Sequence, residues 1–384
     1  MIYRNFGKTG IKMSSLGFGA MRLPMVEKDG AKIVNYELAT PLMQRAFELG
    51  VNYIDTAPFY CDSDSEAAVG KALKGWRDKI YLSTKYPTEN ASGDDMRSWL
   101  EKSLTRLDTN YIDFYHMWGI NIGTMPRIDV KGGVLDSARK ANEEGLIRHI
   151  SFSFHDKAEN MFKIIDTGIF ESVLCQYNLL DRTLEDAIQY AKEKGLGTVI
   201  MGPVGGGRLG APSDVIKSLL SRDVKSSAEM AMRFVISNPN IDVALSGMQD
   251  LHQLEENAKI AAIEGALTNA EIEQINAMMA ENKKLAQLYC TGCNYCLPCP
   301  KKINIPHIFS LMNYHKVYEL TDFSKAEYQK LYIPLENRKA SWEIGWGVDA
   351  GQCAECGICE EKCPQKLKIT EQLRDTHETI GGKL

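Results

Sequence analysis

The 384-residue sequence lacks three features that would place it in a special class. It has no run of about 18 apolar residues, so no membrane-spanning helix is expected. Its formal net charge is only −5, which gives no electrostatic reason to expect a nucleic-acid partner. Residues 1–21 contain no continuous apolar segment of the kind that a secretory signal needs. We therefore expect a cytoplasmic protein that binds neither membranes nor nucleic acids.

Cysteine is sparse over most of the chain, which makes its distribution informative. Only Cys61 and Cys175 precede residue 290, whereas the other eight cysteines lie between Cys290 and Cys363. A cytoplasmic chain seldom forms disulfides. Eight clustered thiols therefore favour metal binding.

Short runs of β-forming residues alternate with helical stretches over about the first 260 residues. The opening residues 3–19 indicate a hairpin with a glycine-containing turn that leads into a strand. Strands are expected at 14–21, 52–57, 79–84, 111–118, 148–154, 172–178, 197–202 and 242–247. Helices are expected at 40–50, 94–108, 183–195 and 250–262, the third ending on Gly195. Eight strands separated by helices predict parallel pairing, and the length fits a closed (β/α)₈ TIM barrel. A doubly wound open sheet is the alternative at this level.

The sequence changes character after Leu267. Residues 268–289 form one continuous helical stretch, and the spacer between the cysteine groups has helical pieces without strand alternation. We therefore expect an α/β chain of two domains, with the barrel at 1–267. A linker helix and a mostly α-helical, ferredoxin-like domain follow at 268–384.

The cysteines fall into two motifs, each ending in Cys-Pro. The second motif has the C-x₂-C-x₂-C-x₃-C-P spacing of bacterial ferredoxins, and the first is one residue shorter in its last gap. In such pairs the fourth cysteine commonly ligates the other cluster. Two [4Fe–4S] clusters are therefore predicted. Their ligand sets are Cys290, Cys293 and Cys296 with Cys363, and Cys353, Cys356 and Cys359 with Cys299. The alternatives are a disulfide framework or zinc sites, which more often use two separated Cys-x₂-Cys pairs.

Polar residues follow two neighbouring strands of the predicted barrel. Asp55 ends one strand, Tyr60 lies in the following loop, and Lys85 ends the next strand. Barrel enzymes place their chemistry at these carboxyl ends. An ammonium beside a phenol lowers the phenol pKa, so Tyr60 with Lys85 predicts a general acid for a carbonyl oxygen. Asp55 is expected to pair with Lys85. Taken singly, the three residues could be a helix cap, a rim aromatic and a surface cation.

The segments GVNYIDTAPFY, LSTK, YIDFY, QYNLL and SGMQDLHQLEEN resemble the aldo/keto reductase family over about residues 1–265. With the cysteine motifs, the whole chain resembles the iron–sulfur aldo/keto reductases of anaerobic bacteria and archaea. The resemblance implies an oxidoreductase that acts on a small carbonyl or alcohol substrate with NAD(H) or NADP(H). It also makes Asp55, Tyr60 and Lys85 three of four catalytic residues. Partly exposed cubanes are damaged by oxygen, so an oxygen-poor cytoplasm is expected.

The fourth catalytic position departs from the family pattern. The family has a histidine five residues after the Asp of YIDFY, and this sequence has Trp118 there. His116 precedes it by two residues and faces the same side of the strand, about 6–7 Å deeper. His116 is therefore a candidate for the catalytic histidine, and a buried, hydrogen-bonded histidine is the alternative.

The resemblance also implies a set of cofactor-binding residues. Two of the three polar residues that hold the nicotinamide amide match, whereas Phe154 replaces the third. The adenine end offers Gln249 and Asp250 but no Lys or Arg for a 2′-phosphate, which favours NADH slightly. The alternatives are a cation from elsewhere, Arg208 or Arg222, or weak binding of either cofactor. The implied residues are Ser153, Gln176, Gly205, Leu209, Gly247, Gln253 and Asn257.

The two halves of the chain handle electrons differently. A nicotinamide transfers a hydride, whereas a [4Fe–4S] cluster transfers one electron, so a bound flavin is possible as a mediator. The clusters either exchange electrons with the barrel site and a ferredoxin-like partner or serve as structural or redox-sensing groups. A third hypothesis is an electron-transfer or sensing module whose barrel binds a ligand or flavin without nicotinamide chemistry.

Overall fold

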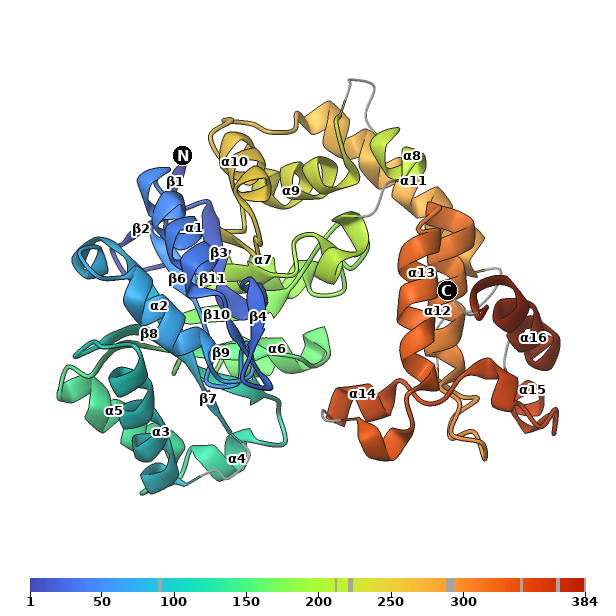
Figure 1. The fold of residues 1–384 in the computed structure, drawn as a ribbon, viewed down its shortest axis with the longest axis horizontal. Helices are drawn as coiled ribbons and strands as arrows, with labels where there is room; N and C mark the ends of the chain where they lie inside the picture. Colours follow the sequence, from blue (N-terminus) through green and yellow to red (C-terminus); the bar gives the residue numbers. More distant parts are fainter. Residues whose placement is uncertain are drawn as a thin grey trace. The chain divides into compact units, whose positions relative to one another are not determined.

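The computed structural model describes residues 1–88, 92–210, 213–219, 224–287, 294–338, 341–363 and 367–382. The chain divides into two compact units (Figure 1). The first comprises Met1–Gly206 and Ala231–Leu267, and the second comprises Gly207–Met230 and Thr268–Leu384. Residues 207–230, which the sequence analysis counts within the barrel, therefore group with the second unit.

Eight parallel strands close into a barrel in the first unit. They are β3 (Leu16–Gly19), β6 (Tyr53–Asp55), β7 (Tyr81–Pro87), β8 (Ile112–Ile120), β9 (Ile147–Phe154), β10 (Ser172–Gln176), β11 (Gly197–Met201) and β12 (Val243–Ser246). All eight predicted strands form, and the closed barrel rather than the open sheet is confirmed. The strands are buried on both faces because helices cover the outside, which explains their nearly continuous apolar character.

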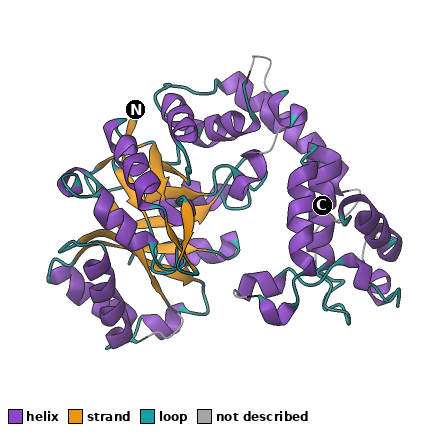
Figure 2. Ribbon diagram, viewed as in Figure 1, coloured by secondary structure: helices purple, strands orange, loops and turns teal. Residues whose placement is uncertain are grey.

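Helices follow the strands around the outside of the barrel (Figure 2). They are α1 (Tyr36–Glu48), α2 (Ser65–Ala72), α3 (Gly93–Arg106), α4 (Met125–Ile128), α5 (Val134–Glu143), α6 (Ala158–Ile165), α7 (Glu185–Lys194), α9 (Ser227–Ser237) and α10 (Leu251–Ile260). Gly195 closes α7 with φ 88°, a left-handed conformation that favours glycine. Short 3₁₀ turns occupy η1 (Ala20–Arg22), η2 (Arg77–Lys79), η3 (Gly205–Gly210), η4 (Lys330–Tyr332), η5 (Leu335–Asn337) and η6 (Ala350–Gln352).

Two antiparallel hairpins flank the first barrel strand. The predicted N-terminal hairpin pairs β1 (Tyr3–Asn5) with β2 (Lys12–Ser14). A second hairpin, β4 (Met25–Lys28) with β5 (Ala31–Val34), follows β3 and was not expected from the sequence. Its turn residues Asp29 and Gly30 both have positive φ, as a tight two-residue turn requires. This hairpin is inserted after the carboxyl end of β3, where barrels carry their functional loops.

The described part of the second unit is helical. It contains α8 (Asp214–Lys217), α11 (Asn269–Gln287), α12 (Ile305–Tyr318), α13 (Thr321–Gln329), α14 (Ser341–Gly345), α15 (Ile358–Lys362) and α16 (Ile369–Ile380). Helices α12, α13 and α16 contact one another around a core that includes Ile308, Leu331 and Leu373. Among the described helices of either unit, we find none that combines the length and apolarity needed to cross a bilayer.

Arg338 organises the chain between α13 and η6. Its guanidinium is nearly buried and donates five hydrogen bonds, all to backbone carbonyls. The acceptors are Leu331, Ile333, Glu343 and Gly347. A planar guanidinium has five N–H donors in a fixed fork, so this one side chain hydrogen-bonds four backbone carbonyls at once.

Candidate active site and cluster-binding cysteines

A buried ion pair lies at the carboxyl ends of β6 and β7. Asp55 ends β6, and the register of the two strands sets it opposite Ser83, two residues before Lys85. The Lys85 ammonium lies 2.6 Å from Asp55 Oδ2 and donates to the Thr56 carbonyl at 2.7 Å. Ser83 donates to the other Asp55 oxygen at 2.7 Å. Both charged side chains are at most 2% exposed, so each is neutralised by the other rather than by water.

The protonation of Lys85 follows from these contacts. Burial alone would lower the pKa of its ammonium, because desolvation disfavours a charge. The charge of Asp55 and the neighbouring Tyr60 oxygen outweigh burial and raise the pKa of Lys85 above its ordinary value. Lys85 is therefore a permanent cation at neutral pH.

Tyr60 lies next to this cation, on the loop between β6 and α2. The Lys85 Nζ atom is 4.6 Å from the centre of the Tyr60 ring. The Tyr60 carbonyl accepts hydrogen bonds from the backbone N–H groups of Ser63 and Ser65. Cys61, Asp62 and Ser63 have φ values of 52°, 53° and 73°, and such left-handed non-glycine residues persist only where the surroundings impose them. This tight turn fixes the backbone that carries Tyr60.

The pKa of Tyr60 differs from the sequence expectation. Burial raises the pKa of the phenol, and the Lys85 cation opposes that effect without cancelling it. The net pKa of Tyr60 lies above its ordinary value, so the expected lowering toward neutrality is wrong in direction. The sequence showed the cation but not the desolvation of the phenol. Tyr60 is consequently a fully protonated acid at neutral pH.

Aromatic rings surround the Tyr60 side of the barrel mouth. Trp118 packs edge-on against Tyr60, with ring centres 6.2 Å apart. The centre of the Phe59 ring lies 6.0 Å from that of Trp118 and 5.3 Å from that of Trp99. Phe59 is 50% exposed. These rings form an apolar wall beside the phenol and the buried ion pair. A flat or apolar group of a ligand would fit this wall.

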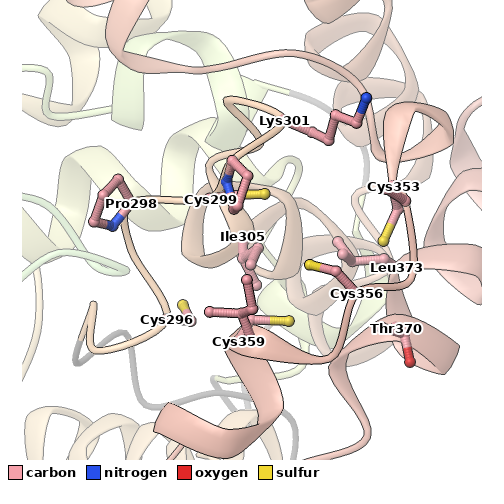
Figure 3. Close-up of a pocket in the computed structure, with 13 residues that line it drawn as sticks. Cys296, Pro298, Cys299, Lys301, Ile305, Cys353, Cys356, Cys359, Thr370 and Leu373 are labelled. Carbon is pink, nitrogen blue, oxygen red and sulfur yellow. The ribbon is translucent and has the colours of Figure 1, made fainter.

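Cysteines from both motifs line one recess in the second unit (Figure 3). Its empty volume, including the part open to solvent, is about 370 Å³. Cys296 and Cys299 line it from the first motif, and Cys353, Cys356 and Cys359 from the second. Cys299 is thus brought to the same recess as the second motif, as cross-ligation requires.

The cysteine arrangement fits a cubane better than a single ion. Among the described residues, no three His, Cys, Asp or Glu side chains converge in the way that one metal ion needs. A [4Fe–4S] cluster instead presents several iron atoms, each of which takes its own thiolate around a cavity. Cys296 and Cys363 are both buried in one hydrophobic core, whereas Cys356 is exposed. Cys290 and Cys293 lie outside the described residues.

Residues 15–280 match the aldo/keto reductase family, and residues 289–369 match the 4Fe-4S dicluster domain. The first match covers more than half of the chain. The chain belongs to the aldo/keto reductase family. It joins the oxidoreductase barrel of that family to a domain of the kind that carries iron–sulfur clusters.

Named relatives and solved structures resemble the barrel. L-galactose dehydrogenase from Arabidopsis thaliana is 29% identical over 73% of this chain and 95% of its own length. The holo form of aldo-keto reductase AKR11C1 from Bacillus halodurans is 28% identical, with a TM-score of 0.61 over 72% of this chain and 96% of that one. A Klebsiella pneumoniae aldo/keto reductase in complex with NADP and acetate is 24% identical, with a TM-score of 0.59 over 71% of this chain and 94% of that one, and shares the fold.

The family's histidine position is occupied by Trp118, and His116 lies deeper in the aldo/keto reductase barrel. His116 is fully buried, and its Nε2 atom lies 3.3 Å from the Tyr53 hydroxyl. Its Nδ1 atom has no hydrogen-bond partner within the described chain. Burial and the charge of Lys85 lower the pKa of His116 to about 3. His116 is therefore a neutral interior side chain beneath the site.

A second histidine, His155, lies at the barrel mouth and was not among the predicted site residues. It follows β9 directly, is exposed, and its Nε2 atom lies 3.1 Å from the Ser153 hydroxyl. The sequence places His155 directly after the fifth barrel strand, near the barrel mouth, but assigns it no role. Its hydrogen bond to Ser153 depends on side-chain geometry that the sequence does not display.

Two residues implied for the nicotinamide end of an aldo/keto reductase cofactor site hydrogen-bond to other side chains of the chain. The Ser153 hydroxyl bonds to His155, and the Gln176 amide lies 3.4 Å from an Asp181 carboxylate oxygen. Gly205 opens η3 in the first unit. Leu209 is buried and groups with the second unit rather than with the barrel strands.

The residues implied for the adenine end gather where β12 meets α10. Asn257 donates to the Ser246 hydroxyl at 3.1 Å, and Gln253 accepts from the Gln249 backbone at 2.9 Å. Gly247 directly follows Ser246, the last residue of β12, and lies next to Arg22. A Cβ atom on Gly247 would lie 3.6 Å from the Arg22 Cβ and 3.8 Å from its Cδ. Arg22 and Gly247 are far apart in the sequence, and the pairing of β12 with β3 that closes the barrel brings them together.

Proposed function

We propose that the protein interconverts a small-molecule carbonyl compound and its alcohol, with a nicotinamide dinucleotide as redox cofactor and Tyr60 as the general acid and base. The observation that carries this proposal is the contact of Tyr60 with the buried Lys85–Asp55 ion pair. A solvent-excluded cation beside a protonated phenol stabilises the phenolate that forms when the phenol gives up its proton.

Each of the three side chains has a distinct part in the proposed reaction. A dihydronicotinamide, when bound, would supply the hydride that the carbonyl carbon needs. Tyr60 gives its proton to the carbonyl oxygen, and the alcohol product forms. Lys85 stabilises the Tyr60 phenolate until water returns a proton, and Asp55 holds Lys85 in place. In the oxidative direction Tyr60 takes the proton from the alcohol.

The cofactor residues that we propose are those implied by the family pattern. Ser153 and Gln176 would hold the nicotinamide amide, Gly205 and Leu209 the diphosphate, and Gly247, Gln253 and Asn257 the adenosine end. Asp250 caps α10 beside the adenosine residues, and a 2′-phosphate next to this carboxylate would be repelled. NADH is accordingly the proposed cofactor.

Eight cysteines are proposed to hold the two [4Fe–4S] clusters in the pairing predicted from the motifs. Cys356 is exposed, whereas Cys296 and Cys363 are buried, and this favours electron transfer at the surface of the second unit. An exposed cluster ligand gives a one-electron partner protein a short path to the iron. We therefore propose electron exchange with a ferredoxin-like partner as the alternative function of the clusters.

The experiment begins with protein purified without oxygen. Iron, sulfide and flavin are measured, and NADH and NADPH oxidation is followed with a panel of aldehydes and ketones. Wild-type turnover that is lost in Tyr60→Phe and kept in Tyr190→Phe supports the proposal. Tyr190 is the matched control because its hydroxyl bonds to Asp166 outside the site. Full turnover by Tyr60→Phe would reject Tyr60 as the acid, and bound flavin would favour electron exchange.

A further inference from the structure

Strand β9 directs a column of polar side chains into the barrel. Successive residues of a strand alternate between its faces, so 151, 153 and 155 share one face. Ser151 is buried and lies 2.7 Å from the Ser172 hydroxyl of β10. Ser153, one step higher, is 1% exposed. His155 follows the last strand residue, Phe154, and is the first member of the column that solvent reaches.

The register of β8 and β9 puts Ser153 on the same face of the barrel wall as Trp118. Trp118 pairs with Ser153, and the register shifts between Trp118 and Ile120. Paired residues of neighbouring strands point to the same side, so Ser153 shares its face with Trp118, whose ring packs against Tyr60, and His155 follows two residues after Ser153. An electrostatic effect agrees with this placement, because partial burial and the Lys85 charge both lower the pKa of His155.

Ser153 also fixes the orientation of the His155 ring. Its hydroxyl lies 3.1 Å from Nε2. Within the described part of the chain, no hydrogen bond is made to Nδ1, so this second ring nitrogen is available for a ligand. A neutral imidazole donates through one nitrogen and accepts through the other. If Ser153 donates to Nε2, Nδ1 carries the proton and is a donor.

His116 has no access to a ligand at the barrel mouth. It is fully buried, and its Nε2 atom is engaged with Tyr53. Trp118 occupies the next position toward the barrel mouth on the same strand. Strand β8 thus has no histidine at the barrel mouth, whereas His155 follows the neighbouring strand β9.

We propose that His155 is a catalytic residue that hydrogen-bonds, through Nδ1, to the oxygen of the substrate opposite Tyr60. This inference rests on the proposed carbonyl chemistry and deepens it. During reduction the Nδ1–H group donates to the carbonyl oxygen as negative charge develops there, and it keeps its proton. The proton that the oxygen finally carries comes from Tyr60, so no net proton passes through His155.

The test uses the full-length holoprotein and steady-state kinetics with a carbonyl substrate on which the wild type turns over. His155→Phe removes the donor and keeps a planar ring, and we expect kcat/KM to fall about 100-fold. His155→Gln restores a donor, and we expect it to recover about tenfold of that loss. His149→Gln, at the opposite end of β9, is the control and is expected to keep wild-type activity. The Kd of NADH, measured by fluorescence, should stay within about twofold in all three variants.

The outcomes separate this inference from the proposed function. If His155→Phe keeps kcat/KM within about threefold while Tyr60→Phe is inactive, His155 has no such role and the carbonyl chemistry stands. A loss of NADH affinity as large as the loss of kcat/KM in His155→Phe would assign His155 to the cofactor and overturn the inference. Full turnover by Tyr60→Phe, or a wild type without carbonyl turnover, would reject the proposed function and the inference with it.

Discussion

The Nζ atom of Lys85 lies 4.6 Å from the centre of the Tyr60 ring. The same atom lies 2.6 Å from Asp55, so one buried cation connects a carboxylate to a phenol. A buried charge is tolerated only when it is paired and hydrogen-bonded. Asp55 provides the pairing, and the Thr56 carbonyl takes another of the three ammonium protons. The remaining side of the cation faces Tyr60, which is where a phenolate would need it.

Replacing Lys85 by methionine is expected to reduce both activity and stability. The variant leaves Asp55 as an unpaired buried carboxylate, and breaking such a pair costs about 3–5 kcal/mol. The phenolate of Tyr60 also loses its stabilising charge, so kcat/KM should fall by about 10²–10⁴. Lys85→Met/Asp55→Asn is the control, because it removes both charges. It should recover thermal stability but not turnover, and recovered turnover would contradict the role of the cation.

The raised pKa of Tyr60 determines the expected pH profile. Reduction requires the protonated phenol, and burial keeps the pKa of Tyr60 above its ordinary value despite Lys85. The value of kcat/KM for reduction should therefore stay flat between about pH 6 and 9 and decline only above about 10. Initial rates in buffers of constant ionic strength measure this profile. A decline centred near pH 7 would show that another group supplies the proton.

His116 predicts a pH-dependent stability of the barrel. The pKa of His116 is about 3 in the folded chain and about 6.5 ordinarily. Below pH 6.5 the imidazole is therefore protonated in the unfolded chain but stays neutral in the folded chain. The free energy of unfolding has its full value above pH 6.5 and decreases as the pH is lowered. The loss between pH 6.5 and pH 5 is about 2 kcal/mol.

The thermal midpoint of the holoprotein, measured at several pH values, tests this slope. His116→Gln should flatten it, because no imidazole remains to titrate. Tyr53→Phe keeps the imidazole while removing its hydroxyl partner, so this variant should keep the slope. Equal slopes in the wild type and His116→Gln would show that another group causes the dependence.

The barrel and its ion pair could be predicted from the sequence because both depend on local order. Strand and helix patterns alternate along the chain, and the ends of adjacent parallel strands meet at one face. Asp55 and Lys85 each end such a strand, so their proximity follows without knowing the side-chain geometry. The β4–β5 hairpin was predictable too, since Asp29-Gly30 between alternating residues is a strong turn signal.

Other features depend on three-dimensional quantities that the sequence does not display. The pKa of Tyr60 depends on how completely its ring is desolvated, and the pattern around it showed only the opposing cation. The placement of His155 depends on the register of β8 against β9 and on the shift after Trp118. Residues 207–230 group with the second unit although they lie between two barrel strands in the chain.

Arg338 is expected to determine whether the second unit forms its cluster site. Replacing it by lysine keeps a charge but supplies at most three donors for the carbonyls that the guanidinium now satisfies. Each unsatisfied buried carbonyl costs about 1–3 kcal/mol. Arg338→Lys should therefore lower the iron content and the visible absorbance of the purified protein. Arg374→Lys alters an exposed pair with Glu355 and should leave both unchanged. Full iron occupancy in Arg338→Lys would contradict this expectation.

The recess shared by Cys299 and the second motif predicts which cysteines belong to one cluster. Cys299 lines that recess with Cys353, Cys356 and Cys359, although more than fifty residues separate Cys299 from Cys353. Cys299→Ser and Cys356→Ser should therefore alter the same electron paramagnetic resonance signal of the reduced protein. Cys363, which does not line the recess, should affect the other signal.

Cys296 is the decisive position in this experiment, because it lines the recess and also belongs to the hydrophobic core that contains Cys363. The motif assigns Cys296 to the cluster of Cys363. If Cys296→Ser changes the signal that Cys363→Ser changes, each motif lends its fourth cysteine to the other cluster. If it changes the signal of Cys356 instead, cross-ligation is wrong. Each iron takes one thiolate. The spectra of the variants at Cys296, Cys299, Cys356 and Cys363 therefore show which cysteines of each motif bind which cluster.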